Sequence, residues 1–172
     1  MGALAISERI GTTGKIAAIE PDIDCFNLLK LNTESNKGHN IIPLHYAIWN
    51  ENKVMQFHKG SYQSNSLVKE VIGSNLKTYD VKAIKIDTLV EELNWERVDY
   101  ISLTINGAEP EALIGALNVF ENNEKVRLSI CGWYERDGVK IEKIGTKYYG
   151  KIVWLRDPID PKTKKIKMLA LI

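Results

Sequence analysis

Two short stretches of the sequence place polar side chains where a predicted strand passes into a predicted helix. In KIAAIEPD, residues 15–22, a short apolar run ends at Glu20. In TINGAEPEAL, residues 104–113, a polar turn follows the apolar run VDYISL. Ligands of open α/β sheets bind outside the carboxyl ends of the strands. Both turns are therefore candidate sites.

Glu20 is the first candidate for chemistry. An acid that ends a strand and is followed by a helix is how nucleotide-binding α/β folds hold ribose hydroxyls. A carboxylate there accepts two hydroxyl hydrogen bonds, each worth about 1.5 to 3 kcal/mol. The alternative is a surface acid near a helix N-terminus, where its charge complements the helix dipole. Both interpretations stay open on this residue alone.

The second candidate is the turn that contains Thr104, Asn106 and Glu109. Asn106 tolerates unusual backbone angles, Gly107 permits close approach, and Glu109 with Pro110 suits the first turn of a helix. Acid–base chemistry would favour carboxylates, but Thr104 and Asn106 are neutral and act only through hydrogen bonds. The stretch predicts either a site that orients a ligand or a tight turn without one.

Other motifs give no support to further classes of enzyme. Lys15 in GTTGK is followed by Ile16 and leads into a strand, so the stretch does not match a phosphate-binding P-loop. The histidines have no partner three or four residues away for metal ligation. No GxSxG motif or other nucleophile–base arrangement is present.

The elements that position these residues alternate between strands and helices. We expect strands at residues 15–20, 41–48, 53–59, 79–86, 98–105 and 126–133. We expect helices at residues 3–10, 21–36, 88–95 and 109–122. This alternation predicts an α/β fold with a mostly parallel sheet and helices on both faces.

The remaining segments are less regular. Residues 60–77 are polar and predict a long loop, which is either a lid or binding segment or a surface loop. Residues 139–150 predict a helix or a loop. Residues 151–155 and 165–172 then predict an antiparallel C-terminal hairpin, joined by a turn that carries the strongest basic run.

Composition indicates one soluble globular domain over residues 1–172, with 44% hydrophobic and 26% charged residues. A formal net charge of +1 gives no field that favours nucleic acid or an anionic membrane. No apolar run reaches the roughly 18 to 20 residues of a membrane span, and no signal peptide is recognisable. We expect a cytoplasmic protein in which Cys25 and Cys131 are buried thiols or, alternatively, a disulfide.

Taken together, three stretches resemble the FkbM-type methyltransferases, which have the class I fold and use S-adenosylmethionine. GKIAAIEPDIDCFNLLKLNTESN is similar to the family's second strand and the helix after it. IIPLHYAIWNENKVMQFH is similar to its third strand and extra hairpin. VKAIKIDTLVEELNWERVDYISLTINGAEPEALIGAL is similar to the stretch that contains its fourth strand. The resemblance covers about residues 2–133.

The resemblance implies a Rossmann-like sheet and methyl transfer to an oxygen of a small molecule or sugar. By this analogy Glu20 holds the ribose hydroxyls of S-adenosylmethionine, and Gly2 is the last glycine of the cofactor loop. Tyr46, Ala47 and Ile48 would then lie beside the adenine.

The same analogy makes Thr104, Asn106 and Glu109 the residues that face the methyl group and the acceptor. The family's pattern here is K-x-D-x-E-G-A-E, whereas this chain has Ser102, Thr104 and Asn106 in place of the lysine, the aspartate and the first glutamate. A general base typically contributes about 10² to 10⁴-fold to a rate, and these residues supply none. The alternative function is therefore a methyltransferase-like binding or interaction module without catalysis.

The family's first strand and glycine-rich loop would precede Gly2. The resemblance therefore predicts a domain that is N-terminally incomplete: a fragment, a split protein completed by a partner, or a degenerate member. An unpaired sheet edge would favour a homo-oligomer or a partner that completes the sheet. A nicotinamide-dependent Rossmann enzyme shares Glu20 but requires a glycine fingerprint before it, so it ranks last.

Overall fold

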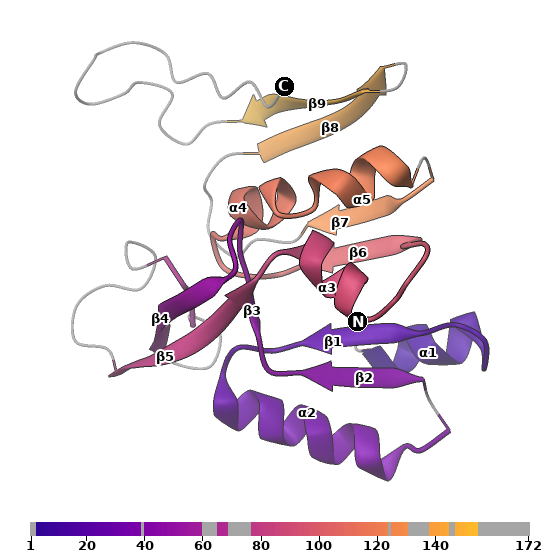
Figure 1. Ribbon diagram of the computed structural model, residues 1–172, viewed down its shortest axis with the longest axis vertical. Coiled ribbons are helices and arrows are strands. Elements are labelled where there is room, and N and C mark those ends of the chain that lie inside the picture. Colours follow the sequence, from indigo (N-terminus) through magenta and orange to yellow (C-terminus); the bar gives the residue numbers. More distant parts are fainter. Residues whose placement is uncertain are drawn as a thin grey trace.

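Helices and strands alternate from residue 3 to residue 44 and again from residue 77 to residue 114 (Figure 1). The computed structural model describes residues 3–38, 40–59, 65–68, 77–123, 125–130, 138–144 and 147–154, the last two ranges through their backbone only. The helices are α1 (Ala3–Ile10), α2 (Ile23–Ser35), α3 (Ile86–Glu92), α4 (Glu109–Ile114) and α5 (Leu117–Asn122). The strands are β1 (Ile16–Ile19), β2 (Ile41–Leu44), β3 (Ala47–Ile48), β4 (Lys53–Lys59), β5 (Lys77–Ile84), β6 (Tyr100–Leu103), β7 (Arg127–Ile130), β8 (Gly138–Ile144) and β9 (Lys147–Trp154).

The described strands form several small sheets rather than one. β1 pairs with β2, β3 with β5, and β6 with β7, and each of these pairs is parallel. β4 pairs with β5 and β8 with β9 in antiparallel fashion. Helix α2 connects β1 to β2, and helices α4 and α5 connect β6 to β7, as parallel pairing requires. The fold is mixed α/β.

The predicted strand at residues 41–48 is divided between two sheets. Pro43 lies in β2 and pairs with Ala18 of β1, whereas Ala47 lies in β3 and pairs with Ala83 of β5. His45 and Tyr46 lie between the two strands, outside either ladder. The chain thus passes from one sheet to the next at these two residues.

The sequence predicted one continuous helix at residues 109–122. This prediction is wrong, because the structure has two short helices there. α4 ends at Ile114 and is followed by Gly115, where a Cβ atom would lie 2.3 Å from the backbone oxygen of Trp49. The buried Asp87 then accepts hydrogen bonds from the backbone N–H groups of Asn118 (3.2 Å) and Val119 (3.0 Å), in the first turn of α5. Close backbone approach and a separate capping carboxylate explain the break.

A second correction concerns the C-terminal part. Residues 139–144 and 147–150, within the segment predicted as a helix or loop, belong to strands β8 and β9. These two strands pair in antiparallel fashion, whereas the predicted hairpin joined residues 151–155 to residues 165–172, and the latter range lies outside the described residues. The sequence VKIE, residues 139–142, alternates apolar and charged residues, a period of two that favours a strand.

Two apolar clusters lie on opposite faces of the β3–β5 pair. Ala47 and Ala83 belong to the smaller cluster, with Phe57 and Val81, whereas Ile48 and Ile84 belong to the larger one. This division follows from the alternation of side chains along a strand. The larger cluster also contains buried residues of α3, β6, α4 and α5 and the residue directly before α5: Ile86, Leu89, Ile101, Leu103, Ala112, Leu113, Ala116 and Val119.

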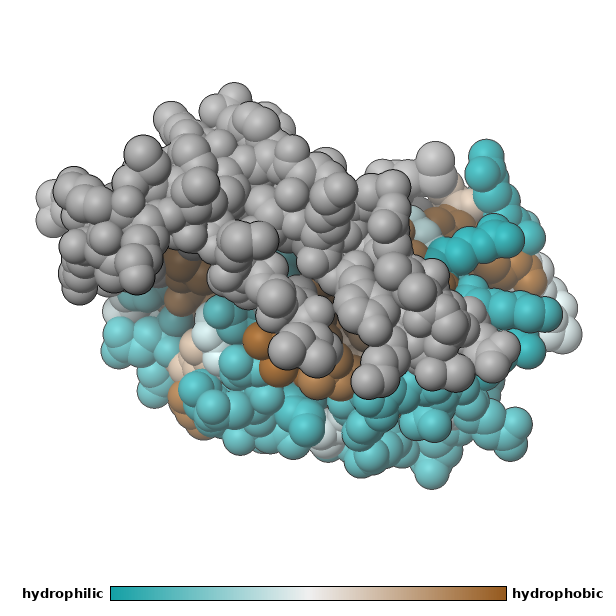
Figure 2. Space-filling model, turned by 90° about the horizontal axis from the view of Figure 1, so that it is seen from above, coloured by the Kyte–Doolittle hydropathy of each residue, from teal (hydrophilic) through white to brown (hydrophobic). Residues whose placement is uncertain are grey.

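The coloured surface in Figure 2 is mostly hydrophilic, and hydrophobic residues reach it only in patches. No helix among the described residues is long and apolar enough to cross a membrane.

Replacing Asp87 by alanine should destabilise the protein by about 1 to 3 kcal/mol. The change removes the acceptor of two N–H groups at the start of α5, and a lost cap or an unsatisfied buried donor costs this much. Urea unfolding followed by circular dichroism measures the effect. The control is Asp99→Ala, whose exposed carboxylate pairs only with Arg97 among the described ion pairs and should cost less than about 1 kcal/mol. Equal effects of the two changes would contradict the capping role.

Candidate functional site

A pocket of about 270 Å³ opens where β1 and β6 end. Its walls come from five places in the sequence: the end of β1 with the start of α2, the β2–β3 passage, Phe57 of β4, the segment near residue 65, and the turn after β6. Its lining residues are Ile19, Glu20, Pro21, Cys25, Tyr46, Ala47, Ile48, Phe57, Asn65, Leu67, Thr104, Ile105, Asn106 and Ala108. The two turns that the sequence singled out therefore face the same space.

Most of the residues predicted to form the site are brought together in this lining: Glu20, Tyr46, Ala47, Ile48, Thr104 and Asn106. Glu109 is not among the lining residues, and Gly2 lies outside the described residues. Within the loop predicted at residues 60–77, Asn65 and Leu67 also line the pocket. The functional roles of these residues remain predictions.

Glu20 is held in place by its own chain. Its backbone N–H donates to the carbonyl oxygen of Leu44 (3.0 Å), and its Oε1 accepts from the backbone N–H of Asp22 (2.9 Å). Oε2 has no hydrogen-bond partner among the described residues. Burial raises the pKa of Glu20, and although the Asp22 N–H opposes this, the net pKa lies above its usual value of 4.5. The pocket thus contains a positioned carboxylate with one oxygen available to a ligand.

Asp22 begins helix α2 as its N-cap. Its side chain is only 1% exposed, and its Oδ1 accepts from the backbone N–H groups of Asp24 (2.9 Å) and Cys25 (3.0 Å). The sequence predicted a helix from residue 21, with Asp22 in its first turn. The helix begins instead at Ile23, and Asp22 directly precedes it. The sequence signal for this role is an aspartate directly before a helix.

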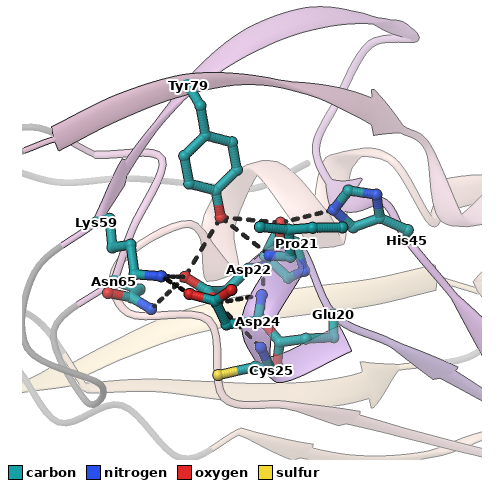
Figure 3. A network of polar contacts seen from close by, with 10 residues as sticks. Glu20, Pro21, Asp22, Asp24, Cys25, His45, Lys59, Asn65 and Tyr79 are labelled. Atoms are coloured by element: carbon teal, nitrogen blue, oxygen red, sulfur yellow. Dashed lines mark hydrogen bonds and ion pairs between the residues drawn. The ribbon is translucent and has the colours of Figure 1, made fainter. Parts of the chain in front are cut away.

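The second oxygen of Asp22 collects three groups from distant segments (Figure 3). Asn65 donates to Oδ2 through its Nδ2 (3.1 Å), the Tyr79 hydroxyl lies 3.3 Å from it, and the Lys59 Nζ lies 3.4 Å from it. Lys59 also contacts the carboxylate of Asp24. Lys59 and Tyr79 belong to β4 and β5, so the hairpin of these strands is fastened to the start of α2. Sequence reasoning did not identify this connection.

The buried network changes the ionisation of its members. Burial raises the pKa of Asp22, but hydrogen bonds from the backbone N–H groups and the charge of Lys59 outweigh it, so the pKa lies below 3.8. Burial raises the pKa of Tyr79 to about 12, and the nearby Asp22 charge acts in the same direction. Asp22 is therefore a structural carboxylate that stays charged.

The turn after β6 has an unusual backbone. Asn106 has φ = 53° and Gly107 has φ = 95°, both in the left-handed region. Glu109 is buried, and its two carboxylate oxygens accept from the backbone N–H groups of Ile105 (3.1 Å) and Gly107 (2.7 Å). The Glu109 carboxylate, which was predicted to face the acceptor, thus binds the backbone of the turn and stabilises its shape.

The pocket offers hydrogen bonds and orientation rather than acid–base chemistry on the side of this turn. Thr104 and Asn106 are neutral, and Asn65, whose carbonyl oxygen accepts from Asn106, is neutral as well. Cys25 is a free thiol whose pKa is raised by burial, so it stays protonated. No group of three or more potential metal ligands occurs among the described residues. A ligand with hydroxyl groups near Glu20 and a polar group near the turn fits this arrangement.

Comparison with known proteins gives one family. The sequence model described as "Methyltransferase FkbM domain" matches residues 3–163. No curated protein and no solved structure matches the chain.

Replacing Asp22 by asparagine should lower stability at pH 7 by about 1 to 2 kcal/mol, since neutral acceptors bond more weakly than a carboxylate. Because the folded-state pKa of Asp22 is lowered, its contribution is present above pH 3.8 and is lost as the pH falls through the folded value. The difference between wild type and Asp22→Asn should therefore shrink below about pH 4. Urea unfolding between pH 7 and pH 3 measures it.

Asp24→Asn is the matched control, because the Asp24 side chain is 67% exposed and should contribute little. A wild-type to Asp22→Asn difference that does not change with pH would show that the charge of Asp22 is not the stabilising factor.

Proposed function

Because the chain belongs to the methyltransferase FkbM domain family, whose sequence model spans residues 3–163, we propose that it transfers a methyl group from S-adenosylmethionine. We propose an oxygen of a small molecule or sugar as the acceptor. The observation that carries this proposal is the positioned carboxylate of Glu20, across one pocket from the neutral turn at Thr104 and Asn106.

The residues present fit the nucleoside part of this cofactor. Ribose offers two neighbouring hydroxyl donors, and Glu20 has one carboxylate oxygen without a partner among the described residues. Tyr46 and Ile48 supply an aromatic and an aliphatic surface in the same lining, suited to a flat base. The volume of about 270 Å³ lies just below the range of ligand sites, roughly 300 to 1,000 Å³. S-adenosylmethionine supplies a methyl group on a positively charged sulfur.

The opposite wall would orient the acceptor. Methyl transfer is an in-line displacement, so correct placement of the acceptor atom supplies much of the rate. Thr104 offers a hydroxyl group to an acceptor, and the backbone of Asn106 is held by Ser66, whose Oγ donates to its carbonyl oxygen (2.7 Å). The side chains of Thr104 and Asn106 do not take up a proton. We therefore expect an acceptor whose methylation does not require a general base in this wall.

We further propose that the parallel pairs belong to a Rossmann-like sheet of the class I methyltransferase type. Two features support this assignment: β1, α2 and β2 form one strand–helix–strand unit, and β6, α4, α5 and β7 form another. The pocket also lies at the carboxyl ends of β1 and β6, where such sheets bind ligands.

Calorimetry with S-adenosylhomocysteine tests the function directly. The wild-type chain should bind the compound, and Glu20→Ala should weaken binding at least tenfold, since each hydrogen bond to a charged group contributes about 1.5 to 3 kcal/mol. Glu34→Ala, which removes an exposed acid at the far end of α2, should leave affinity unchanged. No heat with the wild type at millimolar ligand would refute cofactor binding, and equal affinity of Glu20→Ala would remove Glu20 from the site.

Affinity for S-adenosylhomocysteine should also depend on pH. Only the charged Glu20 accepts two hydroxyl hydrogen bonds, and its pKa is raised above 4.5. Affinity should therefore be constant near pH 7 to 8 and fall as the pH is lowered through this raised pKa. Glu20→Gln should bind weakly at every pH in this range. A wild-type profile that stays flat to pH 4.5 would contradict the role of the carboxylate.

A further inference from the structure

Residues 65 and 66 touch both walls of the pocket. On one side, the Asn65 side chain donates to Oδ2 of Asp22 (3.1 Å), next to Glu20. On the other side, the carbonyl oxygen of Asn65 accepts from Nδ2 of Asn106 (2.8 Å), and Oγ of Ser66 donates to the carbonyl oxygen of Asn106 (2.7 Å). Three hydrogen bonds thus connect the start of α2 to the turn after β6 through two consecutive residues.

This short segment is itself firmly placed. Ser66 is 1% exposed, and its backbone exchanges two hydrogen bonds with His58 of β4, His58 N–H to Ser66 oxygen (2.9 Å) and Ser66 N–H to His58 oxygen (3.1 Å). Its Oγ also accepts from the backbone N–H of Val68 (2.9 Å). The segment is therefore attached to β4 as well as to the two walls, and it has little freedom to adjust if one wall moves.

The contacts to Asn106 act on a backbone that needs support. A non-glycine residue with positive φ is uncommon and costs free energy unless its surroundings hold it. The Asn106 side chain and carbonyl oxygen both bond to the segment, while Glu109 holds the neighbouring N–H groups from inside the turn. The geometry of the turn thus depends on residues 65 and 66.

We propose that Asn65 and Ser66 are positioning residues that set the distance between the two walls of the pocket. They fix the Thr104–Asn106 wall relative to the Glu20–Asp22 wall, so a molecule held by one wall lies at a defined position relative to the other. Their significance for methyl transfer rests on the proposed function, because an in-line displacement requires two ligands in fixed alignment. The mechanical connection itself does not depend on that function.

Hydrogen exchange measured by NMR without ligand tests the connection. Asn65→Ala removes the amide that bonds to Asp22 but keeps the carbonyl oxygen that bonds to Asn106. If the segment transmits position, the Ile105 and Gly107 amides on the far wall should exchange about threefold to tenfold faster, as expected for the loss of about one hydrogen bond. Ser66→Ala should give the same increase, and circular dichroism checks that each variant is folded.

The matched control is Asn52→Ala. The Asn52 amide group bonds to Thr88 and to the backbone N–H of Lys85, outside the pocket, so its loss should leave the Ile105 and Gly107 amides unchanged. Unchanged exchange at these two amides in a folded Asn65→Ala variant, with an effect confined to Asp24 and Cys25, would overturn the proposal. If Ser66→Ala does not fold, Asn65→Ala decides alone.

A second arm adds S-adenosylhomocysteine. In the wild type the ligand should slow exchange of the Ile105 and Gly107 amides, and in Asn65→Ala this protection should be lost at ligand concentrations that saturate the variant. Protection retained in full in Asn65→Ala would count against a positioning role. If the wild type binds no S-adenosylhomocysteine, the proposed function fails, but the comparison without ligand still decides whether residues 65 and 66 connect the walls.

Discussion

The buried carboxylate of Asp22 is the interaction on which the candidate site depends. One of its oxygens starts helix α2, and the other receives groups from β4, β5 and the segment at residue 65. A carboxylate can be buried so completely only when its lone pairs are satisfied, and here five groups surround it. Because Glu20 accepts a hydrogen bond from the backbone N–H of this same residue, the position of the Glu20 carboxylate in the pocket depends on Asp22.

The two carboxylates therefore divide their tasks. The pKa of Asp22 is lowered, and both of its carboxylate oxygens have hydrogen-bond partners. The pKa of Glu20 is raised, and one of its oxygens has no partner among the described residues. The same division occurs in the turn after β6, where Glu109 shapes the backbone and the neutral Thr104 and Asn106 face the pocket. In both walls, a buried acid supports the residue that a ligand would meet.

The sequence predicted the parts of the site that follow from strand order. Glu20 and Asn106 both follow apolar strands, and the carboxyl ends of such strands are known places for ligands. The sequence did not single out Asn65 and Ser66 within the loop predicted at residues 60–77. Neutral polar residues in a loop have no periodic pattern, and the partners of these two residues are 40 or more residues away. The break at Gly115 was missed for a similar reason, since it arises from the backbone of Trp49. The expected strand at residues 41–48 kept its pattern across two sheets, so the apolar sequence alone did not reveal the passage at His45 and Tyr46.

The long sequence separations within the site have a consequence for folding. Asp22 meets Tyr79 across 57 residues, and Ser66 meets Asn106 across 40. Contacts of this kind form only after intervening chain has been ordered, because loop closure must precede them. The pocket cannot be assembled by α2 or by the β4–β5 hairpin alone. Its walls come into register only when the described parts of the chain between Glu20 and Ala108 have folded together, so the affinity of a ligand for this pocket would report on their cooperativity.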